Sequence, residues 1–241
     1  MRTLGKLKLL VLSAFIFVGM TSCLKTSDPD FGISGGNWYV LQQNEIVGTD
    51  TTPEFAPYII FSVNESLAKA TVSSQSFPVE LGGIAGKITG SYWESNTSYL
   101  SYKPELLEET YKIAAYNAAG EMATFSFQIG VKKDKAIGVL KSVFSYDSSK
   151  GLTVKWTPVK NANYYELSIW DPAMSNPRKV AIKNTTDKKE FTFDNYDASK
   201  LGVESGKEYK FELVAYNIEA NRIKIKLVPT SENKFSVTWA K

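Results

Sequence analysis

Apolar and polar residues alternate with a period of two along most of the chain after residue 36. In residues 152–157, LTVKWT, the apolar Leu152, Val154 and Trp156 would face one side of an extended strand and their polar neighbours the other. Further alternating runs, bounded by Gly, Asn, Ser or Pro, occupy residues 165–170, 191–193, 209–215, 222–228 and 234–240. No long window has the apolar spacing of an amphipathic helix. The pattern predicts an all-β protein of short antiparallel strands packed as sandwiches.

Two segments of the second half carry a family resemblance. Residues 152–169, LTVKWTPVKNANYYELSI, resemble the B–C region of bacterial fibronectin type III domains in the spacing of Trp156, Pro158 and Tyr165. Residues 203–209, VESGKEY, resemble the E–F corner of that family, where a tyrosine hydroxyl bonds back to the loop backbone.

The resemblance implies a fibronectin type III-like β-sandwich over residues 138–241. It also implies core positions for Trp156, Tyr165 and Tyr209. A further strand-like run at 234–240 follows the last strand expected for the family. This run either adds a strand or replaces one.

An internal repeat indicates a second unit upstream. Ala115-Tyr116-Asn117 recurs as Ala215-Tyr216-Asn217, and the alternation on both sides stays in register. Residues 109–129 also resemble the last hairpin of bacterial Ig-like domains of the hyaline-repeat and PKD sort. We therefore expect two tandem antiparallel β-sandwiches, with an Ig-like unit at 37–131 before the fibronectin type III-like unit. The charged run KKDK predicts a linker at 132–137.

The N-terminal residues 1–22 predict a signal peptide, because a basic start precedes twelve uncharged residues, too few to span a membrane as a helix. Met20-Thr21-Ser22-Cys23 resembles a bacterial lipobox, which implies lipidation of Cys23. The alternative is an ordinary signal peptide followed by a buried cysteine. Residues 23–36 then form the lipidated Cys and a flexible tether. The acidic residues close behind Cys23 resemble those of Bacteroides-type surface lipoproteins, which implies a lipid-anchored, outer-membrane, cell-surface location.

Composition excludes several classes of chemistry. The 241 residues contain no His and one Cys, which rules out His-dependent nucleophilic triads, imidazole metal sites, a disulfide framework and CxxC redox centres. Asp194 and Asp197 fall in one loop, but neither they nor the other acidic clusters match an acid–base or calcium signature. We expect no enzyme, no catalytic residue, no cofactor and no metal. The chain has no nucleic-acid-binding motif, so nucleic acid is not an expected partner.

Aromatic residues make up 13% of the chain, and three of them are candidates for a ligand platform. Trp170 falls on the polar side of its strand, with Glu166 and Ser168. Tyr92 and Trp93 lie in a stretch rich in Gly, Ser and Asn, where we expect partial exposure. An exposed aromatic ring can stack on a sugar or anchor a protein partner. The alternative is that these rings cap the sandwich ends or fill the joint between the units.

These features predict a lipid-anchored bacterial cell-surface binding or adhesion protein that is not an enzyme. Its expected partners are the membrane, through the N-terminal lipid, and an unknown surface protein or glycan. One alternative is a glycan-binding accessory lipoprotein of a polysaccharide-uptake system, using Trp170 or Trp93. Another is a structural subunit of a surface assembly, for which the run at 234–240 could serve as a donated strand.

Overall fold

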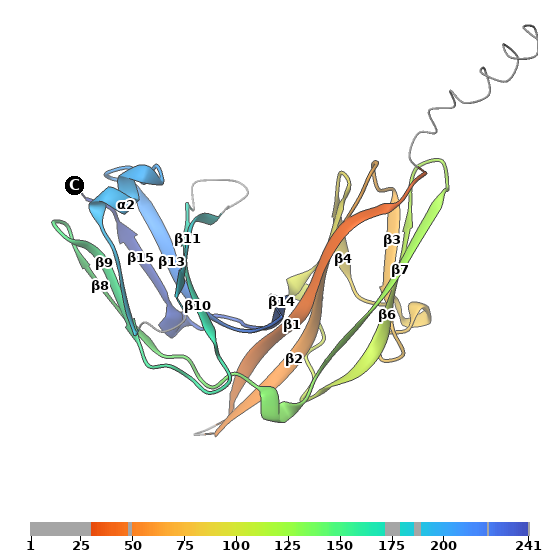
Figure 1. The fold of residues 1–241 in the computed structure, drawn as a ribbon, viewed down its shortest axis with the longest axis horizontal. Coiled ribbons are helices and arrows are strands. Elements are labelled where there is room, and N and C mark those ends of the chain that lie inside the picture. The colour runs from red at the N-terminus through yellow and green to blue at the C-terminus, as the bar shows by residue number, and fades with distance from the viewer. Residues whose placement is uncertain (1–29, 48–49, 172–178, 186–188, 221, 241) are drawn as a thin grey trace, which may run out of the picture.

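The computed structural model describes residues 30–47, 50–171, 179–185, 189–220 and 222–240 (Figure 1). Its described elements are almost all strands, arranged in two sandwich units that stand side by side. This confirms the predicted fold class of two tandem β-sandwiches.

The N-terminal unit contains two facing sheets. One has the order β1 (Ile33–Val47), β2 (Asp50–Val63), β5 (Tyr92–Ser95) and β4 (Gly86–Thr89), and the other the order β3 (Lys69–Ser73), β6 (Leu106–Tyr116) and β7 (Met122–Val131). The 3-10 turns η1 (Val79–Leu81) and η2 (Thr97–Tyr99) lie between strands. Phe55, Ile59 and Phe61 of β2 alternate inward and meet the buried Tyr111 and Ile113 of β6.

The C-terminal unit repeats this two-layer plan. One sheet has the order β12 (Glu190–Phe193), β9 (Gly151–Trp156) and β8 (Ser142–Asp147), and the other contains β11 (Lys179–Thr185), β10 (Tyr164–Trp170), β13 (Glu208–Glu219), β14 (Arg222–Leu227) and β15 (Lys234–Thr238). The short elements are η3 (Lys133–Lys135), α2 (Asn195–Lys200) and η4 (Ser231–Asn233). Trp156, Tyr165 and Tyr209 are buried between the sheets, and the Tyr209 hydroxyl accepts a 2.9 Å hydrogen bond from the Glu204 N–H.

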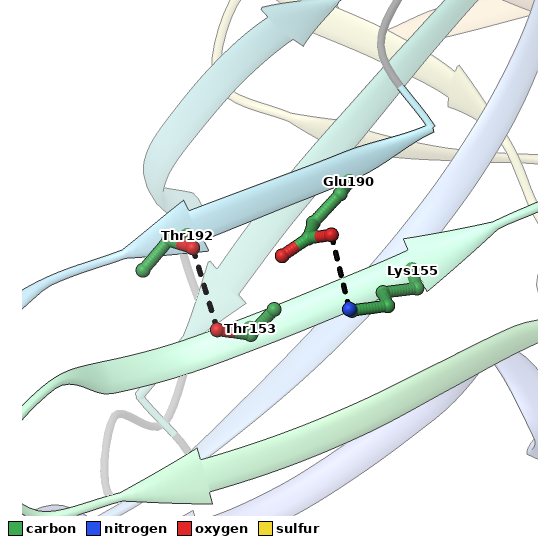
Figure 2. Close-up of polar contacts among 4 residues, drawn as sticks. All are labelled: Thr153, Lys155, Glu190 and Thr192. Carbon is green, nitrogen blue, oxygen red and sulfur yellow. Dashed lines mark hydrogen bonds and ion pairs between the residues drawn. The ribbon is translucent and has the colours of Figure 1, made fainter.

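The pairing of β9 with β12 shows how the alternation sorts side chains. On the outward face Lys155 lies opposite Glu190 at 3.1 Å, and the Thr153 and Thr192 hydroxyls are 3.3 Å apart (Figure 2). The residue between them on β9, Val154, is buried in the core. Exposed pairs of this kind contribute about 0.2–1 kcal/mol each, so they support the strand register while the apolar face supplies most of the stability.

Two strands share the edge of β13. β15 pairs with its first half, from Glu208 opposite Thr238 to Glu212 opposite Lys234, and β14 pairs with its second half, from Tyr216 to Glu219. The last strand of the sandwich is therefore split in two. The run at 234–240, which the sequence left as either an addition or a replacement, takes the place beside β13 that β14 does not occupy.

β14 also joins the two units. On the side away from β13 it runs parallel to β1, with Val40 opposite Ile225 and Gln42 opposite Leu227. This pairing produces one nine-stranded sheet that passes from one unit into the other. In Figure 1 the units meet at β1 and β14 and spread apart from there. The sandwiches are antiparallel as predicted, whereas the pair that connects them is parallel.

Gln42 reinforces this joint with both its backbone and its side chain. Its carbonyl oxygen accepts a 2.8 Å hydrogen bond from the Val228 N–H. Its side-chain Oε1 accepts from the Ile137 N–H and its Nε2 donates to the Ile137 carbonyl, each at 2.7 Å. Gln42 is 0% exposed, so these bonds satisfy backbone groups that water does not reach.

The connection between the units is held along its length. Ile137 and Leu140 are buried, and the side chain of the buried Asn233 donates to the Leu140 carbonyl at 3.0 Å. Asn161 donates to the carbonyls of Asp134 and Ala136, each at 2.8 Å. The predicted linker thus lies in a segment whose backbone is fixed by side chains from both units.

We predict that Gln42→Leu lowers the free energy of unfolding by about 2–4 kcal/mol, because it leaves the buried Ile137 N–H and C=O without partners. Urea denaturation followed by tryptophan fluorescence measures the loss. Gln43→Leu is the matched control: the Gln43 side chain is partly exposed and donates one 2.8 Å hydrogen bond to Glu54, so we expect a loss below about 1 kcal/mol. Equal losses in the two variants would contradict this role of Gln42.

Candidate binding site at the joint between the units

The structure places the sequence-predicted site residues in different environments. Cys23 lies outside the described residues. Trp93 is 2% exposed and stacks on Phe61 with ring centroids 5.4 Å apart. A Cβ at Gly86 would lie 2.1 Å from the Trp93 ring, so this glycine makes room for the indole. The expectation of partial exposure is wrong for Trp93, because its strand turns it inward while its neighbour Tyr92 turns outward.

Tyr92 and Trp170 project from the same face of the nine-stranded sheet, the one turned away from the two three-stranded sheets. Tyr92 is 58% exposed and lies opposite Ser62, whereas Trp170 is half-buried at the end of β10. The strands β13, β14, β1 and β2 separate them in the sheet order. They therefore belong to different units, and the structure does not bring them together as one platform.

Over the joint, the same sheet face carries a cluster of tyrosines that the sequence reasoning missed. The Tyr39 and Tyr58 rings are 5.0 Å apart, and those of Tyr164 and Tyr216 are 5.5 Å apart. The Tyr58 hydroxyl donates to the Glu94 carboxylate. The Tyr216 hydroxyl donates to Glu166 Oε1 at 2.8 Å, and Tyr58 and Tyr216 are buried. We call Tyr39, Tyr58, Tyr164 and Tyr216 the tyrosine cluster.

The electrostatics of the tyrosine cluster suit packing rather than catalysis. Burial, with the Glu94 carboxylate nearby, raises the pKa values of Tyr39 and Tyr58 far above the ordinary value of 10.0. Burial likewise raises the pKa of Tyr216. Lys226 lies 5.9 Å from the centre of the Tyr216 ring, and burial lowers the pKa of its ammonium group. The phenols therefore stay protonated at neutral pH, and those of Tyr58 and Tyr216 donate hydrogen bonds to Glu94 and Glu166.

Beside the cluster, β1 and β14 part from each other and leave a gap that we call the wedge. It lies between residues 36–39 of β1 and residues 222–224 of β14. One hollow of about 320 Å³ and a second of about 160 Å³ fill it, and both are lined by Trp38, Tyr39, Arg222 and Ile223. The wedge exists only because two strands far apart in sequence pair over three residues and then diverge. No local sequence signal marks it.

The acidic residues Asp194 and Asp197, which the sequence places in one loop, have a structural role. Asp194 caps α2, with its side chain accepting a 2.8 Å hydrogen bond from the Asp197 N–H. Within the part of the chain that the structure describes, no three His, Cys, Asp or Glu residues group closely enough to hold a metal ion. Among the same residues, no helix is both long enough and apolar enough to cross a membrane.

No protein-family model matches the chain, and no curated protein matches it. Among solved structures, the chain is similar to the crystal structure of the chicken CNTN1 FN1-FN3 domains, with 11% sequence identity and a TM-score of 0.33. The alignment covers 88% of this chain and 65% of that one, less than two thirds of its length. The fold class rests on the strand order described above.

We predict that the protein loses stability as the pH rises above about 10, the pKa of tyrosine in the unfolded chain. The folded state keeps Tyr39, Tyr58 and Tyr216 protonated because their pKa values are raised. Their contribution is therefore complete below pH 10 and is lost as the pH rises toward their folded values. The lowered pKa of Lys226 acts in the opposite sense and offsets part of the loss. Urea midpoints at pH 8 and pH 11, with phenolate absorbance, measure the effect.

The matched pair for this test is Tyr58→Phe and Tyr99→Phe, because Tyr58 is buried whereas Tyr99 is 74% exposed. Tyr58→Phe should lose less stability between pH 8 and pH 11 than Tyr99→Phe. If all the tyrosines of the native protein titrate near pH 10 and the two variants respond alike, the buried state of the cluster is contradicted.

Proposed function

We propose that this protein is a non-enzymatic binding protein of the bacterial cell surface, held to the outer membrane by a lipid on Cys23. The signal-like residues 1–22 and the lipobox-like run that ends at Cys23 support the anchor. The single observation that carries the binding role is the fixed joint: one continuous sheet and the Gln42 hydrogen bonds hold two sandwiches in a set relation around a hollowed gap. A binding surface made by two units needs such a fixed relation, because ordering flexible parts on binding costs free energy.

The position of the N-terminal end supports presentation of the joint to a partner. β1 begins at Ile33 and reaches the joint at Val40, seven residues later, which corresponds to about 23 Å of extended strand. The predicted flexible tether at 23–36 is wrong for its last four residues, because residues 33–36 pair with β2 as part of β1. A lipid anchor joined through the residues before Ile33 would then attach at the end of the N-terminal unit away from the joint. The joint would face outward from the membrane and be accessible to partners.

Membrane fractionation tests the anchor. Cys23→Ala should move the protein from the membrane fraction to the soluble fraction, because the acylated thiol is the proposed attachment. Ser22→Ala is the matched control, since it keeps a small residue before the cysteine and should leave the protein on the membrane. A Cys23→Ala protein that remains with the membrane as fully as the unsubstituted chain would contradict the lipid anchor.

A second candidate function, glycan binding, is favoured by the shared orientation of Tyr92 and Trp170. Both rings stand on the sheet face away from the three-stranded sheets, and Tyr92 is well exposed. Aromatic rings on a sheet face can stack on sugar rings. The third candidate, a structural subunit that donates a strand, is not proposed, because residues 234–238 already pair with β13 of the same chain.

A carbohydrate array tests the glycan candidate. We expect a glycan signal that falls at least about tenfold in Trp170→Ala and Tyr92→Ala, which corresponds to the loss of about 1.4 kcal/mol of stacking. Tyr99→Ala removes a ring from η2, outside this sheet face, that is 74% exposed against 58% for Tyr92, and it should leave the signal unchanged. Absence of any glycan signal, or a signal that none of the three substitutions changes, would contradict this candidate.

A further inference from the structure

The backbone of β1 is turned toward the wedge at every second residue. Val40 lies opposite Pro57, which has no N–H, and Gln42 directs its carbonyl to Val228 on the other side. In an antiparallel pair, alternate residues bond to one neighbour and the intervening residues to the other. Gly36 and Trp38 share the phase of Val40 and Gln42, so their N–H and C=O groups face away from β2 and into the wedge.

β14, on the opposite side of the wedge, also turns backbone hydrogen-bonding groups toward it. The Ile218 N–H and C=O both bond to the Asn163 side chain, on the side of β13 away from β14. Ile223, which lies opposite Ile218, therefore turns its own N–H and C=O groups away from β13 and toward the wedge. Among the described residues, no backbone hydrogen bond joins Gly36 or Trp38 to a second strand. The wedge is therefore bordered on both sides by strand edges with free hydrogen-bonding groups.

Free strand edges are normally covered or protected by charge, proline or bulges. Past the bulge at Ile33/Gly35, residues 36–39 of β1, GNWY, contain no charge and no proline. An extended peptide is the ligand whose own N–H and C=O groups repeat at the spacing of such an edge. A sugar chain cannot match that repeat, so the backbone geometry favours a peptide.

The side chains around the wedge define which peptide fits. Arg222 and Lys224 line it, and of the described residues that line its two hollows none is acidic. The Arg222 guanidinium lies 6.0 Å from the centre of the Trp38 ring. A neighbouring hollow of about 140 Å³ shares Gly36 and Trp38 with the wedge and is lined mainly by apolar groups, among them Phe61, Ile113 and Phe125. One side of an added strand would thus meet apolar groups, and cations border the gap.

We propose that the wedge binds an extended segment of a partner protein as an added β-strand along β1, and that this segment alternates apolar and acidic residues. The apolar side chains enter the hollow beside Trp38, and the acidic ones pair with Arg222 and Lys224. This inference rests on the proposed binding function and names the class of partner that the joint takes.

The probe is a fluorescein-labelled, capped peptide of sequence Thr-Glu-Val-Glu-Val-Glu-Thr, titrated against the purified protein by fluorescence anisotropy at low salt. We expect saturable binding that weakens at least about tenfold when alternate backbone amides of the peptide are N-methylated, because this removes one row of strand hydrogen bonds. The amide signals of Gly36 and Trp38 should gain protection from hydrogen exchange when the peptide is bound. This readout reports the added strand directly.

Arg222→Ser combined with Lys224→Ser should weaken binding at least about tenfold and flatten its salt dependence. Lys112→Ser combined with Lys141→Ser is the matched control, since both lysines are exposed and neither lines the wedge. Circular dichroism of each variant confirms that it is folded. Binding that is equally strong for the N-methylated peptide, for a version with Lys in place of Glu, or for the Arg222/Lys224 variant would overturn the proposal.

Competition with polygalacturonate distinguishes a peptide ligand from an acidic glycan ligand. If it binds at the wedge and displaces the peptide while the peptide shows no added exchange protection, the ligand is an acidic glycan and the strand proposal is wrong. The outcome is independent of the anchor, because the peptide titration does not depend on the lipid on Cys23. If Cys23→Ala leaves the membrane and the protein binds the peptide, both proposals are supported. If Cys23→Ala leaves the membrane but the protein does not bind the peptide, this inference alone is overturned.

Discussion

The arrangement of the two units depends on the buried side chain of Gln42. A parallel pairing of only three residues is a weak link by itself, since each backbone hydrogen bond adds only about 1 kcal/mol net and parallel pairs are slightly weaker than antiparallel ones. Gln42 adds two buried hydrogen bonds to Ile137, at the point where the chain crosses from one unit to the other. Breaking the joint would leave the Ile137 N–H and C=O without hydrogen-bond partners. The free energy needed to separate the units is therefore far larger than that of the three-residue pairing alone.

The features on either side of the joint follow from this constraint. Because the nine-stranded sheet continues across the joint, side chains of both units meet on one of its faces, and the tyrosine cluster fills that place with two ring pairs bonded to Glu94 and Glu166. The same continuity produces the wedge, since β1 and β14 are fixed together at Val40 and Gln42 and diverge beyond them. A flexible linker would create neither feature.

The sequence predicted what depends on local alternation and missed what depends on distant partners. The strands around Val154 and Tyr209 and the polar-side position of Trp170 follow from period two. The corner at Tyr209 was expected from the family resemblance of residues 203–209, and the Tyr209 hydroxyl accepts the Glu204 N–H there. Trp93 was misplaced because a glycine-rich stretch suggested a surface loop, whereas Gly86 is the space into which the indole packs. The pairing of Val40 with Ile225 joins residues far apart in the chain, and nothing in either strand alone specifies its neighbour. For the same reason Trp38 and Arg222 were not candidates before the fold was known.

Native-state hydrogen exchange of the Ile137 and Val228 amides tests the central claim most directly. Both amides belong to the joint, one bonded to the Gln42 side chain and the other to its backbone. If the two sandwiches form one cooperative body, these amides exchange only through the same global unfolding that exposes the amides of β13, with the same free energy of opening. Exchange at Ile137 and Val228 that is about 100-fold or more faster than in β13 would show that the joint opens on its own, and would contradict the account.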